Sequence, residues 1–143
     1  MTGFFHVYTI LDFFRHFSAF SPIISIRNTN FAKEKIMDKV KELPLRLGIH
    51  RTYKGYHFLV TTLELATESE HNLLFLSKTI FPLVAKKYNT TVYCVERDIR
   101  TVVQNCWNSP CREILLEMAP YPLTKAPTVS EFIDVLYWIL KSE

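Results

Sequence analysis

Apolar and polar residues recur with a helical period along most of this chain, from about Ala32 to the C-terminus. The first periodic stretch predicts a helix over residues 33–47. Its apolar positions are Ile36, Val40, Leu43 and Leu47. Gly48 provides a stop signal directly after it. Pro44 lies inside the stretch, where it is expected to kink or shorten the helix.

Five further helices follow with the same period. The spacing predicts helices over residues 56–67, 73–88, 91–107, 111–118 and from 129 to near the C-terminus. Polar residues 68–72 predict a loop, and Pro82 predicts a kink or a fresh helix start within 73–88. Thr128 and Glu131 have the spacing of a capping box that opens the last helix. Strand patterns are nearly absent, so the sequence predicts an all-α fold of about six helices.

The helix predicted over 91–107 has two contrasting faces. At about 100° per residue, one narrow stripe is apolar and would pack on a core. It contains Val95, Ile99, Val102 and Cys106. A nearly opposite stripe contains Tyr93, Arg97, Arg100 and Gln104. With residues 85–90 before it and Thr90 or Thr91 as its N-cap, this helix is predicted to be the second helix of a helix-turn-helix.

Two guanidiniums, an amide and a phenol on one helix face suit the base edges and phosphates of double-stranded DNA, which is the leading partner. The candidate base readers are Glu96, Arg97 and Arg100. The candidates for backbone or secondary contacts on the same argument are Lys86, Lys87, Thr91, Tyr93 and Gln104. Two alternatives stay open: Glu96 orients Arg100 one turn away, and the lysine pair complements a helix C-terminus.

Composition narrows the class of protein. A chain of 143 residues with 48% hydrophobic residues can build one domain with a core and is not disordered throughout. A net charge of +3 permits nucleic-acid binding without demonstrating it. The five histidines stand apart and the chain has only three glycines, so no catalytic motif or phosphate loop is expected. Three cysteines without a CxxC pair indicate free thiols, and no metal or cofactor is expected.

Residues 1–34 differ from the rest in being rich in Phe and Ser. We expect an N-terminal extension over 1–34, with a loop at residues 27–30, and a helical domain over 35–143. The extension lacks a basic start and an uninterrupted apolar run, so it is not expected to be an export signal or a membrane span. A cytoplasmic protein is therefore expected. A docked helix, a self-association segment and a poorly ordered leader remain alternatives for the extension.

Several short motifs, in order, resemble a known family. They are Leu47-Gly48-Ile49, Lys54-Gly55-Tyr56, Ile80-Phe81-Pro82, residues 85–91, Val95-Glu96-Arg97, Ile99-Arg100, Trp107 and residues 124–133. Together they resemble the C-terminal DNA-binding effector domain of the stage-zero sporulation master response regulator of spore-forming bacteria. The resemblance covers roughly residues 36–143.

The resemblance implies a helical effector-domain bundle, winged-helix-like in its use of a helix-turn-helix. It implies a transcription factor that reads AT-rich promoter sites, commonly as dimers on tandem sites. Base contacts would come from Glu96, Arg97 and Arg100. The resemblance also implies contact with the sigma subunit of RNA polymerase near the recognition helix and the short helix after it.

The chain departs from the family pattern in three ways. Family members carry an N-terminal receiver domain, and no segment of this chain is long enough to be one. Cys94 stands where an arginine is expected, and Thr101 where a histidine is expected, although Thr101 stays a candidate secondary contact. The segment after Trp107 diverges. We therefore expect a receiver-free DNA-binding transcription regulator and not an enzyme. The alternative is a weakly binding or non-binding module that pairs with a full-length regulator and titrates it.

Overall fold

The computed structural model describes residues 21–143, with side chains from Thr29 onward. The contacts divide the chain into two units, with the division between Ile36 and Met37. The unit Met37–Glu143 contains every candidate site residue. The predicted boundary between an extension over 1–34 and a domain over 35–143 stays a prediction, and the first twenty residues of that extension lie outside the described residues. No helix in the described part is long and apolar enough to cross a membrane.

The described residues form six α-helices and one 3-10 helix. In chain order these are α2 (Ser21–Arg46), α3 (Lys54–Glu68), η1 (Glu70–Phe75), α4 (Ile80–Lys87), α5 (Val92–Trp107), α6 (Cys111–Met118) and α7 (Val129–Ser142). Residues 21–143 contain no β-strand, and so no wing. The predicted all-α class is confirmed.

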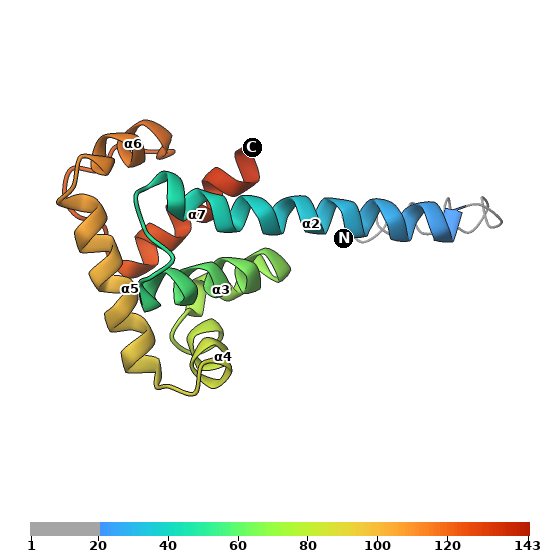
Figure 1. Cartoon of the computed structure of the whole chain (residues 1–143), viewed down its shortest axis with the longest axis horizontal. Coiled ribbons are helices and arrows are strands. Elements are labelled where there is room, and N and C mark those ends of the chain that lie inside the picture. Colours follow the sequence, from blue (N-terminus) through green and yellow to red (C-terminus); the bar gives the residue numbers. More distant parts are fainter. Residues whose placement is uncertain (1–20) are drawn as a thin grey trace. The chain divides into compact units, whose positions relative to one another are not determined.

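Helix α3 lies at the centre of the Met37–Glu143 unit, where it packs against α4, α5 and α7 (Figure 1). It contributes Leu59 and Leu63, both fully buried, to the core. Phe81 from α4, Ile99 from α5 and Phe132 from α7 are buried around them. Burial of each such side chain contributes about 1.5–3 kcal/mol to folding. Because α5 shares this core, the direction of its outer face is fixed by packing.

The start of the first long helix was predicted wrongly. Helix α2 begins at Ser21 rather than near residue 33, and it runs through residues 27–30, which were predicted to be a loop. The physical reason is that this polar stretch contains no Gly or Pro to break a helix. Pro22 is the second residue of α2. Backbone N–H groups in the first turn of a helix have no partner within the helix, so a proline there costs no hydrogen bond. Pro44 stays inside the last turn of α2 and does not end it.

The helix predicted over 73–88 is also wrong, because it is two elements. Helix η1 occupies Glu70–Phe75, part of which was predicted to be a loop, and α4 starts only at Ile80. Pro82 is the third residue of α4, which confirms the fresh-start alternative. The Thr79 hydroxyl donates to the carbonyl of Asn72 at 3.0 Å and holds the turn between the two elements.

The predicted helix ends are mostly confirmed. Gly48, with φ of 73°, follows α2, and Asn89, with φ of 51°, follows α4. Thr128 and Glu131 form the capping box of α7. Trp138 of α7 is 56% exposed. It lies on the same helical stripe as Glu131, Asp134 and Lys141, which form the exposed face of α7.

Candidate nucleic-acid interface

The inner stripe of α5 anchors the helix as predicted. Val95, Ile99, Val102 and Cys106 are all at most 4% exposed. Burial raises the pKa of the Cys106 thiol to about 11, so at neutral pH it is a small uncharged core group. With this stripe in the core, a residue on the opposite side of α5 faces solvent whatever its chemistry.

The outer stripe of α5 is exposed over its whole length. Tyr93 is 70% exposed, and the side chains of Arg97 and Arg100 are each 53% exposed. Gln104 and Thr101 are exposed as well. Helix α5 lies along one edge of the unit, with α4 before it and α6 after it (Figure 1). The structure thus places the predicted residues on one accessible face, and their contact with DNA stays a prediction.

Both arginines of this face have acidic partners on α5 itself. Arg100 donates to Glu96 Oε1 at 2.8 Å, one turn away, which is the contact that an orienting role of Glu96 requires. Arg97 donates to Asp98 Oδ1 at 3.2 Å, and this bond raises the pKa of Arg97. Exposed ion pairs of this kind contribute only about 0.2–1 kcal/mol. The guanidiniums can therefore exchange these partners for DNA groups at little cost.

The start of α5 is fixed by Thr91. Its hydroxyl oxygen accepts a bond from the backbone N–H of Cys94 at 3.2 Å, so Thr91, and not Thr90, is the N-cap. Hydrogen bonding to the Thr91 side chain lowers the pKa of the half-buried Cys94 thiol. Thr101 uses its hydroxyl to donate to the Arg97 carbonyl at 3.1 Å, within the helix. Both threonines therefore have a structural role besides any contact with DNA.

Lys86 and Lys87 form the last turn of α4 and are exposed. The Lys87 ammonium lies 5.4 Å from the centre of the Tyr88 ring and 3.5 Å from Thr61 Oγ1. Lys87 is therefore held in one direction, whereas no partner is recorded for Lys86 among the described residues. The turn at residues 88–91 links these cations to the start of α5.

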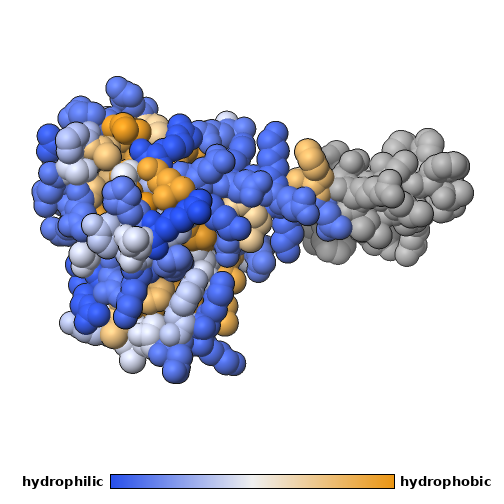
Figure 2. Space-filling view, viewed as in Figure 1, coloured by the Kyte–Doolittle hydropathy of each residue, from blue (hydrophilic) through white to orange (hydrophobic). Residues whose placement is uncertain are grey.

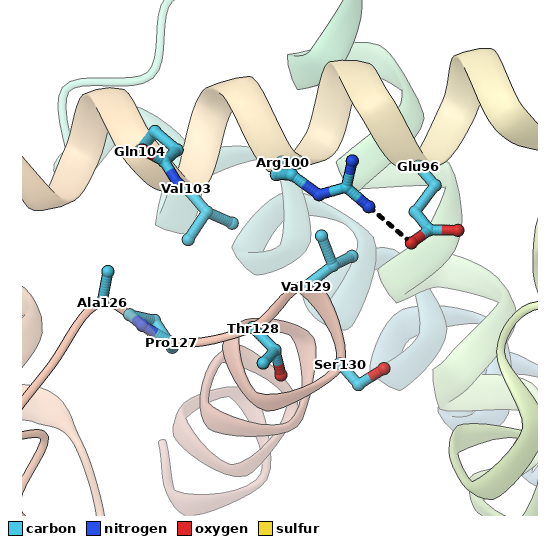
Figure 3. A pocket seen from close by; sticks show the side chains of 9 residues that line it. All are labelled: Glu96, Arg100, Val103, Gln104, Ala126, Pro127, Thr128, Val129 and Ser130. Carbon is cyan, nitrogen blue, oxygen red and sulfur yellow. Dashed lines mark hydrogen bonds and ion pairs between the residues drawn. The ribbon is translucent and has the colours of Figure 1, made fainter.

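A cleft of about 420 Å³ lies between α5 and the start of α7. Figure 3 shows Glu96, Arg100, Val103 and Gln104 on the α5 side, opposite residues 126–130. In this view the bonded pair of Glu96 and Arg100 forms one end of the cleft. The outer face of α5 is thus bounded on one long edge by the segment that leads into α7.

A second, smaller cleft of about 180 Å³ lies along the other edge of α5, against the start of α3. Its lining residues are Tyr53, Lys54, Gly55, Asp98, Thr101, Val102 and Asn105. Sequence reasoning missed Tyr53, Lys54 and Asn105 as candidate site residues. The signal available was the Lys54-Gly55 pair, because a glycine in a helix start can allow a close approach of two backbones.

Figure 2 shows one face of the unit with hydrophilic residues over most of it and hydrophobic residues scattered between them. Among the described residues no group of three or more His, Cys, Asp and Glu side chains could hold a metal ion.

Comparison with known protein families places this chain. The family model described as "Sporulation initiation factor Spo0A C terminal" matches residues 40–140. The chain belongs to this family. It is thus a sporulation-related DNA-binding effector domain, of a regulatory rather than an enzymatic family. The match covers α3 to α7 and so includes the helix-turn-helix formed by α4 and α5.

Proposed function

We propose that this chain is a sequence-specific transcription regulator that inserts α5 into the major groove of DNA. The observation that carries the proposal is the pair of opposite stripes on α5. The stripe with Val95 and Ile99 is buried, and the stripe with Tyr93, Arg97 and Arg100 is exposed. A helix held this way by its neighbours can enter the groove without unfolding any core contact.

Each residue then has a distinct role. Arg97 and Arg100 read base edges, and Glu96 orients Arg100 or accepts from a cytosine amino group. Lys86 and Lys87 hold backbone phosphates on the α4 side. Secondary contacts come from Thr91, Tyr93, Thr101 and Gln104.

The regulator works in the cytoplasm, where the chromosome is. It binds tandem sites as a homodimer. The exposed residues of α6, among them Arg112 and Glu113, face the sigma subunit of RNA polymerase. The homodimer on tandem sites and the contact with the sigma subunit follow from the resemblance of the sequence to the family.

A fluorescence anisotropy titration tests the proposal. The protein is titrated onto a labelled duplex that carries an AT-rich box of the family type and onto a scrambled duplex, over a series of salt concentrations. We expect tighter binding to the box duplex, with an affinity that falls steeply as salt rises because bound counterions are released. Equal and feeble binding to both duplexes would contradict the proposal.

One observation favours the alternative function, a module that pairs with a full-length regulator and binds DNA weakly. Position 94 carries a cysteine where the family pattern has an arginine, and the half-buried Cys94 lies beside Arg97 near the start of α5. The thiol offers no positive charge to DNA.

Restoring the cation distinguishes the two functions. Cys94→Arg is expected to strengthen binding to both duplexes by about five- to tenfold at 0.1 M salt, because one added phosphate contact changes the salt slope by about 0.9. The same titration measures this gain, with Cys94→Ser as the uncharged control. If wild type does not bind and Cys94→Arg does, the alternative function is the correct one.

A further inference from the structure

We propose that the cleft between α3 and α5 is a second phosphate site, in which Lys54, Tyr53 and Asn105 hold a DNA backbone phosphate. This inference rests on the proposed function and adds a contact that lies outside the helix-turn-helix. It assigns a role to the start of α3, an element that otherwise serves only the core.

The close approach of α3 to α5 creates this site. Gly55 is buried, and a Cβ atom built on it would lie 2.6 Å from the Asp98 carbonyl oxygen and would also meet the Val102 side chain. Only a glycine allows the two helices to come this near. As a result, the neighbouring residues Tyr53 and Lys54 stand directly beside the outer face of α5, where Tyr53 is 50% exposed.

The cleft follows one row of that face. Arg97, Thr101 and Asn105 are spaced four residues apart, so their side chains form a row along α5. Thr101 and Asn105 line the cleft, while Arg97 begins the row. A helix in the major groove has a sugar–phosphate strand on each side, and the residues that border its reading face reach those strands. A phosphate in the cleft would thus lie beside the bases that Arg97 reads.

Charge distinguishes this cleft from the one on the α7 side. Among the described residues Lys54 is exposed and has no ion pair, and the one carboxylate in the cleft, Asp98, is bonded to Arg97 at 3.2 Å. The α7-side cleft contains the ion pair of Glu96 and Arg100 but no further cation, and Glu131 follows its last lining residue, Ser130. The unpaired Lys54 therefore favours an anion on the α3 side.

Removing the cation tests the site. We expect Lys54→Gln to weaken binding to the box and scrambled duplexes alike, by about five- to tenfold at 0.1 M salt, and to lower the salt slope by about 0.9. Lys141→Gln is the matched control. It removes the same charge near the far end of α7, roughly 18 Å along the helix from Val129. The circular dichroism spectrum and melting temperature of both variants should equal those of wild type.

A set of duplexes with one uncharged methylphosphonate linkage each locates the phosphate. One linkage should weaken binding of wild type but cause no further loss in Lys54→Gln, since the two changes remove the same contact. The phosphate site is refuted, while the proposed function stands, if Lys54→Gln binds DNA like Lys141→Gln. It is also refuted if every linkage lowers the affinity of wild type and of Lys54→Gln by the same factor. If wild type itself does not prefer the box duplex, the proposed function fails first.

Discussion

Replacing Arg100 with alanine is expected to abolish the preference for one base pair in the target site. The Arg100 guanidinium is exposed on the reading face and is oriented by Glu96 at 2.8 Å. A guanidinium that donates two bonds to guanine discriminates against the wrong base by about 1–3 kcal/mol, or roughly 5- to 150-fold in affinity. Competition titrations with duplexes substituted at each position in turn measure this loss.

Two further variants separate base reading from charge. Arg100→Lys keeps the positive charge but cannot make the planar two-bond contact, so it should lose the same preference while its salt slope stays close to that of wild type. Lys87→Ala should weaken all duplexes alike and flatten the salt slope. If Arg100→Ala and Lys87→Ala give the same uniform loss on every duplex, Arg100 does not read a base.

A second large effect is expected from Gly55→Ala, on stability. The added methyl group would collide with the Asp98 carbonyl oxygen and with Val102. Alanine gains about 0.4–1 kcal/mol over glycine by restricting the unfolded chain. Overpacking against a helix backbone costs about 1–3 kcal/mol, and the backbone atom cannot move alone. The cost outweighs the gain, so the free energy of unfolding should fall by about 1–2 kcal/mol in a urea titration.

The collision with Val102 can be relieved separately. In a Val102→Ala background, Gly55→Ala should cost less than it does in wild type, because one of the two collisions is gone. Thr52→Ala, an exposed change next to the same helix start, is the control and should leave stability within about 0.5 kcal/mol. If Gly55→Ala lowers the free energy of unfolding equally in wild type and in Val102→Ala, α3 and α5 are not in the close contact described.

The elements of the helix-turn-helix could be predicted because their signals are local. Thr91 caps α5 through its own side chain, and Asn89 ends α4 in the left-handed region. Once α5 runs uninterrupted from Val92 to Trp107, the helical period alone assigns Val95 and Arg97 to opposite faces. The candidate base readers follow from that assignment.

The features that were not predicted depend on tertiary contacts, or lie where the sequence has no strong signal that ends a helix. Residues 27–30 are polar without being helix breakers, so polarity alone predicted a loop that does not form. Lys54 and Asn105 are far apart in sequence and become neighbours only because Gly55 brings α3 against α5.

Protection of guanine N7 from methylation on the box duplex tests the central claim most directly, because N7 lies in the major groove. The claim that α5 reads this groove predicts that bound protein protects at least one guanine N7 within the box. It also predicts that Arg100→Ala removes the protection at one guanine while the protein stays bound. Saturated binding that leaves every guanine N7 in the box open to methylation would contradict the claim.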